Sequence, residues 1–165
     1  RNLDVPIVTG TNTAKKADWK ENLARNYLFW TPHPWWALRA EYQFERAKRN
    51  QRFNNGVRDV DTHRVPLGVN FSHPSGFSAF LTGTYWDQSG TFQRLSTLTY
   101  QSGRDDFWVV DAAIRYRLPQ RYGFVTVGAT NLFDQKFKYF NTDFNNPGSL
   151  QPTRTVFAQF TLAIP

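Results

Sequence analysis

Few side chains in this sequence could take part in catalysis, and those few are scattered. Three histidines and no cysteine are present, which excludes a thiolate nucleophile, a disulfide framework and a thiolate metal site. His33 and His73 fall in Pro-containing segments typical of turns, and no carboxylates accompany them to complete a metal site. Asp105 and Asp106 beside Arg104 indicate a solvated loop end, with contact to a cation or substrate as the alternative. We predict no catalytic residue, no metal and no cofactor, and therefore no enzyme.

The elements that hold these residues are predicted to be strands, because apolar and polar residues alternate with period two. The alternation is clear over residues 36–45, 64–72, 77–85, 108–118, 123–133 and 156–164, and less regular over 21–30. The pattern predicts an all-β protein with seven antiparallel strands.

The connections between these strands alternate in length. Residues 31–34, 72–76 and 119–123 form short Pro- or Gly-containing links, as tight turns require. Polar connections of about 20 residues separate the other strand pairs, near 45–63, 86–106 and 134–153, which is long for a compact soluble domain. Short turns at one end of the strands and long loops at the other are typical of a transmembrane outer-membrane β-barrel.

Two further patterns favour a membrane barrel. The apolar stripes span about nine to eleven residues, the length that a tilted strand needs to cross hydrocarbon. The opposite faces carry charges such as Arg39, Glu41 and Asp111, which suit a wet lumen. Aromatic residues near the stripe ends are predicted to form the interfacial girdles: Trp30, Trp35, Trp36, Tyr42, Phe44, Tyr85, Trp108, Tyr116 and Phe133. Alternation alone does not say which face is enclosed, so a soluble barrel or sandwich remains an alternative.

Basic residues are concentrated between Glu45 and Arg64 in a chain of net charge +7. On an outer-membrane loop they could be simply solvated, contact lipopolysaccharide phosphates, or attract an anionic ligand. Nucleic-acid binding uses the same residue types, but no nucleic-acid partner is predicted. The predicted lipopolysaccharide or ligand contacts are Arg46, Lys48, Arg49, Arg52 and Arg58, with Lys136 and Lys138 further along the chain.

Residues 127–137 read VGATNLFDQKF, in which Asn131, Leu132, Phe133 and Asp134 precede Phe137. This segment resembles the penultimate-strand signature of TonB-dependent outer-membrane receptors. Residues 108–118 (WVVDAAIRYRL) and 154–164 (RTVFAQFTLAI) resemble the strands on either side of it. Independently of the family, Asn and Asp can bond nearby backbone groups and so terminate a strand at the membrane surface.

The resemblance implies that residues 1–165 are the C-terminal part of a 22-stranded barrel, whose plug domain and TonB box are not in this chain. It further implies active uptake of a ferric siderophore, cobalamin, haem or glycan across the bacterial cell outer membrane. The implied partners are outer-membrane lipid, lipopolysaccharide, the small-molecule or iron-chelate substrate, and TonB through the plug.

Two other functions remain open at this point. One is a passive outer-membrane channel or a small eight-stranded structural barrel, in which residues 2–8 supply the eighth strand despite Pro6. The other is a soluble basic β-barrel that acts as a binding module.

Overall fold

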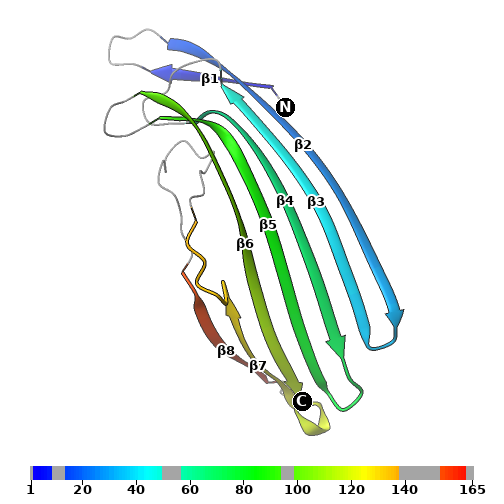
Figure 1. Cartoon of the computed structure of the whole chain (residues 1–165). Helices are drawn as coiled ribbons and strands as arrows, with labels where there is room; N and C mark the ends of the chain where they lie inside the picture. The colour runs from blue at the N-terminus through cyan, green and yellow to red at the C-terminus, as the bar shows by residue number, and fades with distance from the viewer. Residues whose placement is uncertain (1, 9–13, 50–56, 94–98, 138–152, 163–165) are drawn as a thin grey trace.

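The chain forms one antiparallel sheet in which each strand pairs with the next along the sequence (Figure 1). The computed structural model describes residues 2–8, 14–49, 57–93, 99–137 and 153–162. Sequential pairing follows from the short hairpin links and confirms the all-β prediction. The strands are β1 (Asn2–Val8), β2 (Ala14–His33), β3 (Trp36–Arg49), β4 (Val57–Ser72), β5 (Phe77–Gln93), β6 (Tyr100–Arg117), β7 (Gly123–Thr130) and β8 (Thr155–Leu162).

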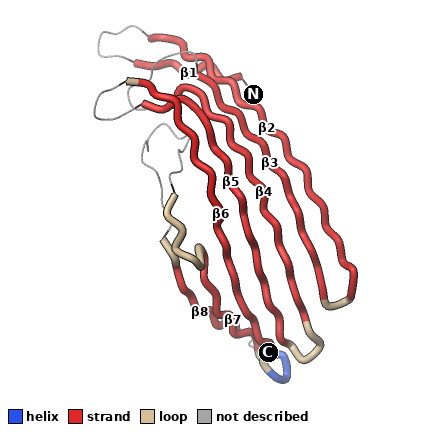
Figure 2. The backbone as a smooth tube through the Cα atoms, in the orientation of Figure 1, coloured by secondary structure: helices blue, strands red, loops and turns tan. Residues whose placement is uncertain are grey.

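The three predicted tight turns are all present and lie at one end of the sheet (Figure 2). His33 pairs with Trp36 across the first turn. The second turn contains Gly76 at φ +94°, whose N–H donates to the carbonyl of His73 at 3.0 Å. The third is a short 3₁₀ turn, Pro119–Arg121, which leads to Gly123 at φ +138°. Both glycines occupy backbone conformations that L side chains rarely adopt. We call this end of the sheet the turn end.

The strands from β2 to β6 are longer than the alternation predicted, with 14 to 20 residues each. The prediction of long loops near 45–63 and 86–106 is therefore wrong, because most of those residues lie in β3, β4, β5 and β6. Polar side chains do not prevent a strand when neighbouring strands supply the ladder hydrogen bonds. Residues 50–56 and 94–98, and residues 138–152 of the third predicted loop, lie outside the described residues. We call the end opposite the turns the loop end.

The sheet is stepped, because β7 and β8 contain only eight residues each. The predicted strand 123–133 ends earlier, at Thr130, and Asn131 follows with φ +47°. β1 and β8 lie at opposite edges, and no pairing between them occurs among the described residues. The closed eight-stranded alternative is therefore wrong, although residues 2–8 do form the extra strand that it required.

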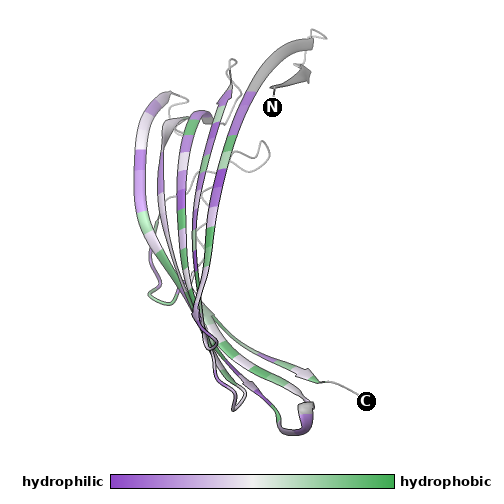
Figure 3. Cartoon of the chain, turned by 90° about the vertical axis from the view of Figure 1, so that its right-hand side faces the viewer, coloured by the Kyte–Doolittle hydropathy of each residue, from purple (hydrophilic) through white to green (hydrophobic). Residues whose placement is uncertain are grey.

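Strand register divides the side chains between two faces. We call the face that carries Leu38, Val69, Leu81 and Ala112 the apolar face, since these residues are aligned directly across β3 to β6. The opposite, polar face carries the neighbouring residues in each strand, among them Glu41 and Asp111. Figure 3 shows the alternation of hydrophobic and hydrophilic residues along the long strands.

Candidate functional site

The apolar face is built from rows of apolar residues that continue from strand to strand. Because the register is uniform from β3 to β8, each row crosses six strands, with successive rows two residues apart. One row contains Trp36, Phe71, Ala79, Ile114, Val127 and Ala158, and the next contains Leu38, Val69, Leu81, Ala112, Ala129 and Val156. These rows carry no charged residue.

Burial on the two faces is the reverse of that in an ordinary water-soluble sheet. On the polar face, Glu41, Thr62, Thr84, Gln88 and Thr126 are buried, with Gln88 only 2% exposed. On the apolar face, the large side chains of the middle strands are exposed, including Leu81 at 50%, Ile114 at 52% and Trp108 at 49%. The polar face therefore carries the more buried side chains in the middle of the sheet, which the alternation alone could not predict.

The reversal is not complete at the loop end or on β2. At the loop end, Ala47, Val60 and Phe92 form a small buried apolar cluster on the polar face. On the edge strand β2, Tyr27 and Phe29 are exposed on that same face, where they pair with Glu41 and Arg39 of β3. The exceptions lie outside the central rows, where the exposed apolar surface is continuous.

The apolar face ends sharply toward the loop end. Tyr42, Val65, Tyr85 and Trp108 form its last row, and the rings of Tyr85 and Trp108 lie 5.4 Å apart. The next row contains Phe44, His63, Asp87 and Asp106, and the Tyr42 hydroxyl lies 2.8 Å from Nδ1 of His63. Beyond this, ion pairs join Arg104 to Asp87 at 2.8 Å and Arg46 to Asp61 at 3.3 Å.

Aromatic residues also gather at the turn end. Trp36 packs on Phe71 with ring centroids 4.8 Å apart, and Trp35 lies between the imidazoles of His33 at 5.0 Å and His73 at 4.8 Å. The other residues predicted for the turn-end girdle, Trp30 and Tyr116, are exposed on the apolar face.

The two turn histidines are engaged in the turns themselves. Nδ1 of His33 accepts the N–H of Trp35, and Nδ1 of His73 accepts the N–H of Ser75, each at 3.2 Å. A neutral imidazole that accepts through Nδ1 carries its proton on Nε2 and offers no second lone pair. In the described part of the chain, no group of three or more His, Asp or Glu residues is placed to hold a metal.

The polar face carries a connected series of charged and planar groups. Arg25 of β2 and Gln43 of β3 both bond the carboxylate of Glu41. Arg64 donates to Oε1 of Gln43 at 3.3 Å, and its guanidinium lies 4.8 Å from the ring centre of Trp86. The sequence alone did not identify Arg25, Gln43 or Trp86, because their partnership depends on cross-strand register.

Nearer the turn end, Arg115 has the same kind of environment. Its guanidinium lies between the rings of Phe80 at 5.2 Å and Phe124 at 5.6 Å, and it donates to the Thr126 hydroxyl at 3.2 Å.

Among the residues that the structure describes, the predicted basic cluster is divided between the two faces of the sheet. Arg46 and Arg64 point to opposite faces. Arg64 pairs with Gln43 of β3, which lies three residues before Arg46 and therefore on the other face of that strand. Lys48 and Arg58 are exposed. Arg52 and Lys138 lie outside the described residues, as does the side chain of Arg49. Lys136 pairs with Asp134 at 3.1 Å.

The Asn131–Asp134 element is a tight turn that binds three parts of the sheet together. The N–H of Asn131 donates to the carboxylate of Asp111 in β6 at 2.8 Å, and its buried side chain exchanges two hydrogen bonds with the backbone of Gln135. Asp134 accepts the N–H of Arg154, just before β8, at 3.1 Å. Asn and Asp do bond nearby backbone groups as predicted, but they form a turn in the left-handed region and not an extended strand end.

The same turn directs the chain toward the polar face. Phe137 stacks on Phe107 of β6 with ring centroids 4.1 Å apart and an interplanar angle of 10°. Phe107 in turn faces Trp86 at 6.3 Å, so the planar series that begins at Arg64 ends on Phe137. Leu132 and Phe133 stay outside this series, and Phe133 is 72% exposed.

The architecture defines the chain as an open antiparallel sheet protein with an exposed apolar face. None of the helices in the described ranges is long and apolar enough to cross a membrane. Comparison with protein-family models, with curated proteins and with solved structures finds no match to this chain.

Proposed function

We propose that this chain forms part of the wall of an outer-membrane barrel that takes up a scarce nutrient with energy from TonB. The observation that carries the proposal is the reversed burial. An apolar face with Leu81 and Ile114 half exposed, opposite a polar face with Gln88 and Thr84 buried, suits lipid outside and water or protein inside.

The height of the apolar face supports a bilayer as its surroundings. Along β5 it extends from Phe77 to Tyr85, eight residue steps, or about 27 Å at about 3.4 Å each. At the strand tilt of about 35–45° in such barrels, this corresponds to roughly 20 Å, near the usual apolar band of about 25 Å. Aromatic rings border it at both ends, where interfacial girdles are expected.

The two edges of the sheet support a larger barrel. β1 pairs only with residues 14–20 of β2, so residues 22–33 of β2 pair with no strand on that side among the described residues. The opposite edge, β8, is exposed along its whole length. An open edge in lipid leaves backbone groups unsatisfied, so further strands are needed at both edges.

Active uptake, in contrast to passive diffusion, is inferred from the Asn131–Asp134 signature and its resemblance to TonB-dependent receptors. The substrate would be a ferric siderophore, cobalamin, haem or a glycan. In this assignment the polar face would line the interior, facing water or a plug domain.

The test uses the full-length gene product, expressed in bacteria that either contain or lack TonB. Uptake of iron chelates, haem, cobalamin and glycans is measured in both strains. The proposal expects one substrate class to accumulate only when TonB is present. Equal uptake in both strains would indicate a passive channel, and recovery of the protein in the aqueous fraction would contradict a membrane function.

A further inference from the structure

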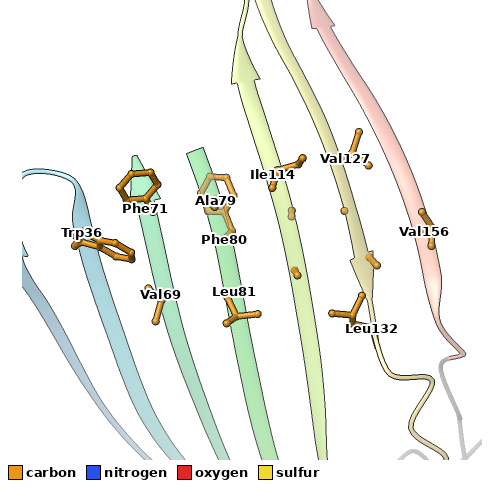
Figure 4. Close-up of a pocket in the computed structure, with 14 residues that line it drawn as sticks. Trp36, Val69, Phe71, Ala79, Phe80, Leu81, Ile114, Val127, Leu132 and Val156 are labelled. Atoms are coloured by element: carbon orange, nitrogen blue, oxygen red, sulfur yellow. The ribbon is translucent and has the colours of Figure 1, made fainter. Parts of the chain in front are cut away.

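A recess at the turn end contains charged and polar groups, in contrast to the recess on the apolar face. The labelled side chains around the apolar recess are all apolar, so none of them selects a particular partner (Figure 4). The recess at the turn end has a volume of about 380 Å³, within the range of roughly 300–1,000 Å³ for small-molecule sites. We call it the rim recess. Its lining includes two aromatic rings, two hydroxyls, an imidazole and a guanidinium: Trp35, Phe124, Ser72, Ser78, His73 and Arg117.

Strand register places the polar lining of the rim recess on the polar face. Ser72 pairs with Ser78 across the second turn, and Arg117 pairs with Phe124 across the third. Ser78 also pairs with Arg115, two residues before Arg117 in β6, so the side chains of these residues share one face. The rim recess is therefore formed where two neighbouring hairpins meet, on the face opposite the exposed apolar rows.

Gly76 allows Arg117 to lie against the second turn. The N–H of Arg117 donates to the carbonyl of Gly76 at 2.8 Å. A Cβ atom placed on Gly76 would lie 3.1 Å from Cβ of Arg117 and 3.6 Å from its Nε. Nη2 of Arg117 lies 3.5 Å from the carbonyl of Pro74, at the outer limit for a hydrogen bond. No ion pair holds this guanidinium within the described ranges, so most of its five N–H donors are available to a ligand.

The charges around the rim recess favour an anion. Residues 31–36, 72–78 and 117–124 contain no acidic residue. Along the polar face of β6, the first acid from Arg117 is Asp111, three rows away, and its carboxylate already accepts the N–H of Asn131 at 2.8 Å. Nδ1 of His73 accepts the N–H of Ser75, so the neutral imidazole has only a donor to offer. A guanidinium without a carboxylate partner, beside further donors, attracts a negatively charged group.

We infer that the rim recess binds a small organic anion, with its carboxylate or phosphate on Arg117 and its apolar part on Trp35 and Phe124. The planar guanidinium directs two parallel N–H donors at such a group, and the hydroxyls of Ser72 and Ser78 supply further donors. The two rings offer apolar surface that an inorganic ion would not use. The site goes beyond the proposed function, because it does not depend on what covers the apolar face.

The experiment is isothermal titration calorimetry on the full-length protein, in mild detergent or in plain buffer, whichever keeps it folded. The probes are benzoate, phenyl phosphate, inorganic phosphate and the uncharged benzyl alcohol. We expect wild type to bind the two aromatic anions more tightly than inorganic phosphate and not to bind benzyl alcohol. Arg117→Gln should weaken both aromatic anions by about tenfold or more, the loss expected when a charge-assisted hydrogen bond is removed.

Arg115→Gln is the matched control, because it removes the same charge from the same strand and face. The Arg115 guanidinium is held by Phe80, Phe124 and the Thr126 hydroxyl, and it does not line the rim recess. We expect its affinity for both aromatic anions to equal that of wild type. Equal weakening by Arg115→Gln and Arg117→Gln would indicate general attraction by charge and would overturn the site.

Two further variants keep the test decisive. Arg117→Lys, which keeps the charge but not the planar fork, replaces Arg117→Gln if that variant does not fold, and it should also bind more weakly than wild type. Trp35→Leu should weaken benzoate and phenyl phosphate but not inorganic phosphate. The inference is overturned if no Arg117 variant changes the affinity, if wild type binds neither aromatic anion, or if inorganic phosphate binds equally tightly. A protein that folds in plain buffer refutes the membrane function, whereas a membrane-inserted protein that binds no anion refutes only this site.

Discussion

Leu81 provides the sharpest test of which face meets the membrane. It lies four residues from Phe77 and four from Tyr85, at the middle of the apolar face, and is half exposed. If lipid covers this face, Leu81→Lys places an ammonium near the bilayer midplane. The expected cost is about 2–4 kcal/mol of the free energy of unfolding. If water covers it, the same exposed substitution changes stability by only about 0.5 kcal/mol or less.

Thr82→Lys is the matched control, because Thr82 is the next residue and belongs to the polar face. The assay is urea unfolding of the full-length protein in phosphatidylcholine vesicles, followed by tryptophan fluorescence. We expect Leu81→Lys to be the more destabilising of the two by at least about 1.5 kcal/mol, allowing for some snorkelling of the long side chain. Equal effects, or a larger effect of Thr82→Lys, would refute the assignment of lipid to the apolar face.

Three further predictions concern the turn after β7 and two glycines, Gly83 and Gly128, that lie close to aromatic rings. Asn131→Ala removes two hydrogen bonds from a buried turn and should cost about 1–3 kcal/mol, measured by urea unfolding; an unchanged midpoint would contradict the account. The N–H of Arg154 and, to a smaller extent, the side chain of Lys136 lower the pKa of Asp134. The hydrogen bond from Arg154 to Asp134 is therefore fully present above the ordinary carboxyl pKa. This hydrogen bond is lost as pH falls through the lowered pKa. The measurement is hydrogen exchange of the Arg154 amide, which should lose its protection in acid in the wild type, whereas Asp134→Asn should show no such pH dependence. Gly128→Ala should destabilise the protein by about 1–3 kcal/mol, because its Cβ would meet the Phe157 ring and the backbone carbonyl of Ala112. Gly83→Ala should be tolerated, because its Cβ would lie 3.5 Å from the Trp108 ring. Equal thermal midpoints of the two variants would refute this prediction.

The alternation and the turn chemistry were sufficient to predict β2 to β8 and the tight turns, whereas β1 was part only of the eight-stranded alternative. Period two follows directly from strand geometry, and Gly76 and Gly123 occupy the positive-φ positions that such turns require. The lengths of the strands could not be predicted in the same way. Residues such as Thr62 and Gln88 look like loop residues by polarity, but a neighbouring strand on each side supplies their backbone partners.

The site was less accessible to sequence reasoning, because it depends on which residues meet across strands. The aromatic residues Tyr42, Tyr85 and Trp108 were identified singly, but only the register aligns them in one row. The arginines near residue 50 looked like one cluster, yet Arg46 and Arg64 lie on opposite faces. The role of Asn131 as a buried turn residue also escaped the prediction, since its partner Asp111 is 20 residues away in the chain.

The most direct measurement of the central claim is the environment of neighbouring residues on the two faces. Single spin labels at positions 81 and 82 of the full-length protein in lipid bilayers would report collisions with oxygen, which concentrates in lipid, and with a water-soluble nickel complex. The account predicts high oxygen and low nickel accessibility at position 81, and the lower oxygen accessibility at position 82. High nickel accessibility at position 81 would contradict it.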